Sequence, residues 1–153
     1  LPAENLDSLR ERLNSNCTLT EEQLEEKIIV DREVPLGESN RQLVEQLQLL
    51  QPAGQGNEEV VFARCGLQLC SVRIFGKEHQ ISRCQIRDQG ETFYAVDFNL
   101  EQHLKPAVIQ RYGAGAWEEL ERGCVKELLL DILYTPEINV RYGDVQYRIL
   151  DCR

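Results

Sequence analysis

The sequence is poor in the side chains that bind metals. It has no methionine and only two histidines, His79 and His103, among 153 residues. Its six cysteines include no C-x-x-C pair, the short spacing that is typical of structural zinc sites. The best cluster is Cys65, Cys70, His79 and Cys84, and its gaps match no familiar zinc module. We therefore predict no metal site and no cofactor.

Catalytic and phosphate-binding motifs are missing as well. Gly113 and Gly115 precede an expected helix, but the preceding strand and the third glycine of a phosphate-binding loop are absent. A nucleophilic cysteine needs a histidine and an orienting group nearby, and nothing local joins Cys65 to His79. We assign no catalytic residue. A thiol-dependent enzyme or redox protein that uses Cys65 or Cys17 remains an alternative.

Long apolar runs are also lacking. None approaches the roughly 18 residues that a membrane-spanning helix requires, so we expect no membrane segment. The length suits one domain with its own core. We expect residues 1–153 to form it, with a helical segment at 1–51 and a sheet with helices at 58–153. No signal-peptide pattern is present, and a cytoplasmic protein is favoured over a secreted one.

Basic residues are scarce and unevenly placed. The chain has 17 Lys and Arg against 26 Asp and Glu, a net charge of -9. Residues 1–59 hold 13 acidic and 5 basic side chains, residues 60–88 hold 2 and 5, and residues 89–153 hold 11 and 7. Nucleic-acid binding needs cationic surface to displace phosphate counterions. The overall charge therefore argues against nucleic acid as the partner.

Helical spacing dominates the first fifty residues. Leu6, Leu9 and Leu13 recur at the spacing of one helix face. Capping boxes begin at Thr20 and at Ser39. We expect two or three short helices here.

From Val60 the apolar period changes to two, which predicts an antiparallel meander of about four strands. The expected strands are 60–64, 67–75, 81–88 and 92–98. The face expected to be core carries Cys70, Val72, Ile74, Cys84, Ile86, Tyr94, Val96 and Phe98. The face expected to be wet carries Leu69, Ser71, Arg73, Phe75, Arg83, Gln85 and Arg87.

The last third of the chain reads as helix followed by hairpin. Asn99 is expected to cap a helix over 100–112. A core helix near 116–134 would place Trp117, Leu120, Cys124, Leu128 and Ile132 on one stripe. A hairpin over 138–150 turns at Gly143-Asp144. The predicted fold class is α+β.

The cysteines divide into two groups. Cys70, Cys84 and Cys124 fall at expected core positions, which predicts buried thiols. Cys17, Cys65 and Cys152 are not explained by packing, so each is a candidate for a disulfide or an exposed thiol. Asn16-Cys17-Thr18 matches the glycosylation pattern. A secreted, disulfide-bonded inhibitor or extracellular ligand with Asn16 glycosylated is therefore an alternative.

One surface carries an unusual charge pattern. Arg73, Arg83 and Arg87, with Phe75 close by, would project from adjacent strands. Guanidinium groups pair with carboxylates or phosphates and stack on rings. Such a face could hold an acidic partner segment or a single nucleic-acid strand. An ordinary solvent face, or a face covered by the chain's own acidic N-terminal helices, would explain the same pattern. We predict a non-catalytic protein-binding or assembly module that uses these four residues and the acidic helices. The oligomeric state is left open.

Overall fold

Five strands of the chain close into a β-barrel. The computed structural model describes residues 5–20, 28–76, 80–124 and 127–153. In these ranges the elements are α1 (Leu6–Ser15), β1 (Arg32–Glu33), the 3-10 helix η2 (Leu36–Glu38), α3 (Arg41–Gln48), β2 (Phe62–Phe75), β3 (Ile81–Asp88), β4 (Glu91–Asp97), α4 (Leu104–Tyr112), α5 (Ala114–Glu121), β5 (Leu128–Ile138) and β6 (Val145–Cys152). The predicted mixture of helix and sheet is confirmed.

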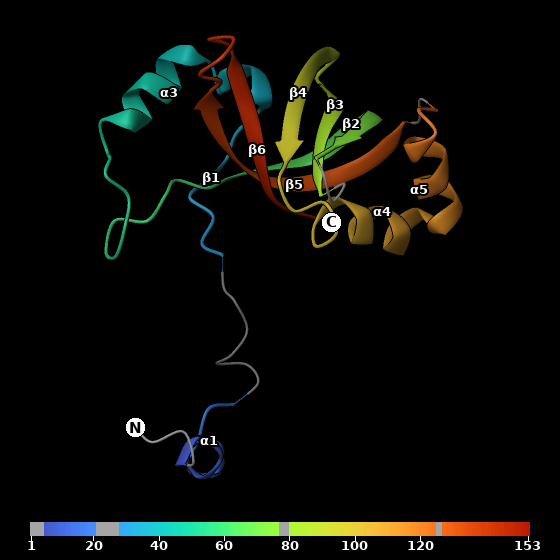
Figure 1. Cartoon of the computed structure of the whole chain (residues 1–153). Coiled ribbons are helices and arrows are strands. Elements are labelled where there is room, and N and C mark those ends of the chain that lie inside the picture. Colours follow the sequence, from blue (N-terminus) through green and yellow to red (C-terminus); the bar gives the residue numbers. More distant parts are fainter. Residues whose placement is uncertain (1–4, 21–27, 77–79, 125–126) are drawn as a thin grey trace.

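The barrel order is β2-β3-β4-β6-β5, and β5 pairs back onto β2 (Figure 1). The β4–β6 pairing is parallel, and the other four barrel pairings are antiparallel. β1 adds to β2 in parallel. Full closure leaves the barrel without a free edge. No described helix has the length and apolar character needed to cross a membrane.

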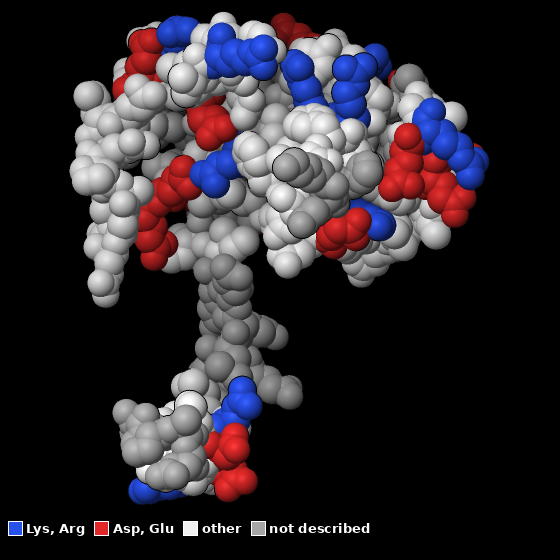
Figure 2. All heavy atoms as spheres, in the orientation of Figure 1, with Lys and Arg blue, Asp and Glu red and all other residues white. Residues whose placement is uncertain are grey.

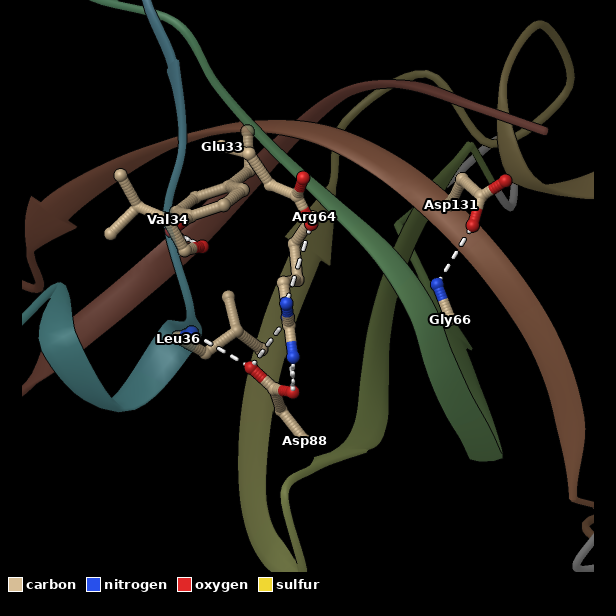
Figure 3. Close-up of polar contacts among 8 residues, drawn as sticks. Glu33, Val34, Leu36, Arg64, Gly66, Asp88 and Asp131 are labelled. Atoms are coloured by element: carbon tan, nitrogen blue, oxygen red, sulfur yellow. Dashed lines mark hydrogen bonds and ion pairs between the residues drawn. The ribbon is translucent and has the colours of Figure 1, made fainter.

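β2 is one strand of 14 residues where the sequence predicted two. The expected strands 60–64 and 67–75 are continuous, because Gly66 has φ of +70° and the pairing with β5 only shifts register between Arg64 and Leu67. The Gly66 N–H donates to Asp131 Oδ1 at 2.8 Å (Figure 3). Such a bulge bends a strand without ending it.

The predicted core helix over 116–134 is wrong. α5 ends at Glu121, Gly123 follows with φ of +77°, and β5 begins at Leu128. In β5, Leu128, Leu130 and Ile132 are buried and alternate with more exposed residues. A run of leucines fits the period of a helix as well as that of a strand. Here it forms a strand because β5 pairs with β2 and closes the barrel. Cys124 is consequently exposed.

The faces of β4 are the reverse of those predicted. The turn at Gln89-Gly90 pairs Asp88 with Glu91, which sets Cys84 opposite Ala95. Ala95 and Asp97 therefore point inward and are fully buried. Tyr94 and Phe98, which were expected in the core, are 47% and 50% exposed.

A register shift between β2 and β3 also places Leu69 in the core. A second register shift lies between Leu69 and Ser71, and Leu69 is 1% exposed although it was expected on the wet face. Alternation alone cannot reveal such a shift, because one extra residue exchanges the two faces.

Of the helices expected in the first fifty residues, the structure describes α1 and α3. α1 lies where expected, and all its residues are exposed. The helix expected from Thr20 falls mostly on residues 21–27, outside the described residues. Asn40, rather than Ser39, caps α3, because its Oδ1 accepts the Leu43 N–H at 3.1 Å.

Helices and a strap cover the barrel core at different places. α4 and α5 contribute Leu104, Val108, Trp117 and Leu120 to the buried cluster, and Figure 1 shows them below the strands. Residues 31–39, which we call the N-terminal strap, contribute two more apolar side chains, Val34 and Leu36. Tyr134 donates to Val34 O at 2.9 Å, and Tyr147 donates to Leu36 O at 2.8 Å. The strap is thus part of the core.

Candidate functional site

The outward face of β2, β3 and β4 forms a groove with the loop between β5 and β6. Its volume is about 530 Å³. The lining residues that carry charge or a ring are Arg73, Phe75, Arg83, Tyr94, Phe98, Tyr142 and Asp144. Arg73 and Phe75 face this groove because they alternate along β2 with Val72 and Ile74, which face the barrel interior. Three of the four residues predicted for the contact face therefore lie together.

The groove is unusually aromatic for a solvent surface. Phe75, Tyr94, Phe98 and Tyr142 are all exposed, although the whole chain has only ten aromatic residues, four Phe, five Tyr and one Trp. Clustered exposed rings mark binding surfaces, because each ring offers apolar area with a defined plane. The groove therefore provides stacking surfaces for a flat ligand.

Two arginines face each other across the β2–β3 ladder in this groove. Arg73 is the register partner of Arg83, and the Arg83 guanidinium lies 4.3 Å from the centroid of the Tyr94 ring. Like charges directly opposite one another destabilise a sheet. Among the described residues, neither arginine has a carboxylate partner. Arginines with such a partner are Arg41, Arg64, Arg87, Arg122 and Arg148.

Arg87, the fourth predicted contact residue, is placed elsewhere. It lies toward the far end of β3, opposite Gln68, and its Nη1 is 3.3 Å from Glu127 Oε1. Its charge is already countered. The structure therefore separates Arg87 from Arg73, Phe75 and Arg83.

The loop over 139–144 is shaped by Asn139. Its Oδ1 accepts the N–H groups of Arg141 at 2.9 Å and Tyr142 at 3.2 Å. The Arg141 guanidinium lies 5.4 Å from the centroid of the Tyr142 ring. Asp144 is the carboxylate of this wall. The loop thus presents the Tyr142 ring and the Asp144 carboxylate to the groove.

Charge is segregated over the surface of the barrel. Figure 2 shows Lys and Arg side chains gathered along the upper rim, with acidic side chains mainly on the flanks. An acidic protein can therefore present locally basic surface, which the net charge does not reveal.

Sequence reasoning missed Tyr94, Phe98 and Tyr142. The two-residue turn at Gln89-Gly90 was the signal for Tyr94 and Phe98, because it sets the register in which Tyr94 pairs with the outward-facing Gln85. No pattern in the sequence marks Tyr142, whose placement depends on the loop closing over the barrel.

All six cysteines are free thiols, so the disulfide alternative gains no support. Cys17 and Cys65 are exposed, whereas Cys152 is a core residue. The predicted burial of Cys70 and Cys84 is confirmed. Asn16 is exposed at the end of α1, and its Nδ2 donates to Arg12 O at 2.8 Å. Glycosylation there stays a prediction.

Three of the thiols, those of Cys65, Cys84 and Cys152, have raised pKa values and are therefore not activated as nucleophiles. Burial raises the pKa of Cys84 to about 12 and raises that of Cys152. The pKa of Cys65 is raised by desolvation and by Asp131, and a raised pKa lowers the thiolate fraction. His79, the partner considered for Cys65, lies outside the described residues.

Comparison with known proteins identifies the barrel. A family model described as "RecJ OB domain" matches residues 30–151. A search of curated proteins finds no match. Among solved structures, a putative aspartyl-tRNA synthetase from Leishmania major Friedlin is similar, with 11% identity and a TM-score of 0.44. The alignment covers 99% of this chain and 26% of that one, so the chain spans about a quarter of its length.

The family match contradicts the prediction that nucleic acid is an unlikely partner. An OB fold is an architecture whose sheet face and loops bind oligonucleotides. The prediction was wrong because it used the charge of the whole chain, -9. The net charge does not describe local surface: Arg73 and Arg83 line the groove and have no carboxylate partner among the described residues.

Proposed function

Because the chain belongs to the RecJ OB-domain family, we propose that it binds a single-stranded nucleic-acid segment in the groove between β2–β4 and the 139–144 loop. OB folds use the face of their second and third barrel strands and the loop between the fourth and fifth. Here those elements are β3, β4 and the 139–144 loop. The aromatic groove lies on these same elements.

The observation that carries the proposal is the pair Arg73 and Arg83. The two arginines are register partners that line the same groove, and neither forms an ion pair with a carboxylate among the described residues. A phosphate bound between them would remove their mutual repulsion and accept forked hydrogen bonds from both.

The rings favour unpaired bases over duplex. Tyr94 projects outward from the middle of β4, and Phe98, which directly follows β4, is exposed as well. Stacking of a base on such a ring contributes about 1–3 kcal/mol. In a duplex the faces of the bases are already stacked on their neighbours, so they are not available to these rings. Single strands are therefore the expected substrate class.

An acidic protein segment is the second candidate for the same face. It is the partner that the sequence predicted for a non-catalytic binding or assembly module, and Arg73 and Arg83 would pair with its carboxylates. Such a segment would use the charges of the groove but not its rings, and that difference separates the two candidates experimentally.

Binding of labelled oligonucleotides measured by fluorescence anisotropy tests the proposal. The probes are a 15-nucleotide single strand as DNA and as RNA, the matching duplex, and a poly-glutamate peptide. We expect the single strand to bind more tightly than duplex or peptide, and Tyr94→Ala with Phe98→Ala to weaken it at least tenfold. Tighter binding of the peptide, with no effect of the ring substitutions, would instead support the protein-binding function.

A further inference from the structure

We propose that a second hollow, beside the aromatic groove, binds the terminal phosphate of the nucleic-acid strand. This inference rests on the proposed function and specifies its substrate. The hollow has a volume of about 310 Å³ and is lined by Ser71, Arg73, Arg83, Gln85 and Tyr94. It shares Arg73, Arg83 and Tyr94 with the groove.

The lining is built from hydrogen-bond donors. Ser71 Oγ donates to Gln85 Oε1 at 3.2 Å, which leaves both amide N–H groups of Gln85 for another acceptor. The guanidinium groups of Arg73 and Arg83 add further donors and two positive charges. None of the described lining residues is a carboxylate, although acidic residues outnumber basic ones by 26 to 17 in the chain.

Strand register places these four donor side chains close together on one face of the sheet. Ser71 pairs with Gln85 and Arg73 pairs with Arg83, so the four side chains leave the same face from consecutive same-face positions. The rows lie roughly 7 Å apart along the strands, and opposite Cβ atoms are about 5 Å apart. At these spacings, the four flexible polar side chains can all reach a single tetrahedral anion.

The charge of the site suits a terminal phosphate better than an internal one. A phosphodiester carries one negative charge and two free oxygens. A terminal phosphate carries about 1.5 to 2 negative charges at neutral pH and three strong acceptor oxygens. Arg73 and Arg83 supply two positive charges, and the Gln85 amide supplies a third direction of donation. The geometry therefore matches the end of a strand.

Arg83 connects the phosphate hollow to the base groove. Its guanidinium lies over the Tyr94 ring at 4.3 Å, and both residues line both hollows. A strand whose end phosphate occupies the hollow would place its first bases beside Tyr94. The two hollows then act as one site for the end of a single strand.

Three oligonucleotides of identical sequence test this inference, one with a 5′-phosphate, one with a 3′-phosphate and one with hydroxyl groups at both ends. We expect one phosphorylated strand to bind about tenfold more tightly than the hydroxyl strand, the gain from one additional charged hydrogen bond. The better of the two phosphates identifies which end is bound. Equal binding of all three overturns the inference and leaves the proposed function standing. Absence of binding by all three overturns both.

The double variant Gln85→Ala with Ser71→Ala tests whether the end phosphate binds in this hollow. This double variant should lose the preference for the phosphorylated end while retaining the affinity for the hydroxyl strand. Gln68→Ala is the matched control, because Gln68 lies on the same outward face of β2 opposite Arg87, outside the hollow. It should keep the preference. An unchanged preference in the double variant, with its thermal unfolding also unchanged, would show that the phosphate binds elsewhere.

Discussion

Arg64 and Asp88 form a forked ion pair at the end of β3, with Arg64 Nη2 to Asp88 Oδ1 at 2.8 Å and Nε to both carboxylate oxygens at 3.1 Å. Asp88 Oδ2 also accepts the Leu36 N–H of the N-terminal strap at 2.9 Å (Figure 3). The pair raises the pKa of the Arg64 guanidinium, chiefly through its hydrogen bond to Asp88. The charge of Arg64 is therefore used to hold the Asp88 carboxylate that attaches the strap.

Removing the Asp88 charge should destabilise the fold. Asp88→Asn leaves Arg64 half-buried without its main counter-charge, although the side chain can still accept from Leu36. Loss of one partner of a buried pair costs about 3–5 kcal/mol, and the 19% exposure of Arg64 reduces the expected loss to about 2 kcal/mol. Urea unfolding measures it. Glu45→Gln, in the exposed pair with Arg41, should cost less than about 1 kcal/mol, and an equal loss in both variants would contradict this role.

The bulge in β2 should require glycine at position 66. Gly66 has φ of +70° with open space around its Cβ position, so Gly66→Ala tests backbone conformation without a clash. We expect a loss of about 1–2 kcal/mol in the free energy of unfolding. Gly54→Ala is the control, since that position also has open space but no positive φ. A neutral effect at Gly66 would mean that the bulge relaxes.

The salt dependence of oligonucleotide binding should report how many phosphates the groove arginines contact. For single strands, the slope of log affinity against log salt is about -0.7 per phosphate contact. Because Arg73 and Arg83 contact the same phosphate, Arg73→Gln with Arg83→Gln should reduce the slope by about 0.7, measured by anisotropy between about 50 and 300 mM salt. Arg87→Gln should leave the slope unchanged, because Arg87 already pairs with Glu127. A reduced slope in the Arg87 variant would place the phosphates along the whole of β3.

Alkylation of the native protein should distinguish two classes of cysteine. Iodoacetamide at pH 8 is expected to modify Cys17, Cys65 and Cys124, which are exposed, and to leave Cys70, Cys84 and Cys152 protected by burial. Mass spectrometry after peptide digestion assigns the sites. Denaturation without reductant should then expose six alkylable thiols in total. Any shortfall would indicate a disulfide, and rapid native modification of Cys84 would contradict its burial.

Stability should fall at alkaline pH. Burial raises the pKa of Tyr134 and of Tyr147 to about 12, from 10 in the unfolded chain. Because the folded pKa values are raised, the stabilisation is complete below pH 10 and is lost as the pH rises toward 12. Urea unfolding between pH 8 and 11.5 measures this loss. Tyr147→Phe should make the decline shallower, and an unchanged pH profile in that variant would contradict the assignment.

Much of the fold could be predicted from local patterns, and the remainder depended on pairing. The period of two from Val60 and the caps near Ser39 indicate strands and helices correctly. The leucines at 128–130 fit either period, so only closure against β2 makes them a strand. The contact face was partly predictable, because Arg73, Phe75 and Arg83 alternate with apolar residues. Tyr94 and Phe98 required the register between β3 and β4, which local alternation does not provide.

Closure of the barrel joins residues that are distant in the sequence. Phe62 pairs with Tyr134, and Leu69 pairs with Leu128. Contacts at such separation form slowly during folding. Until β5 docks, the 14 residues of β2 present unpaired backbone groups along one side, and an open strand of this length pairs readily with other chains. A nascent or proteolysed chain that ends before Leu128 would therefore expose an aggregation-prone edge, and synthesis of β5, Leu128–Ile138, is the step that removes this hazard.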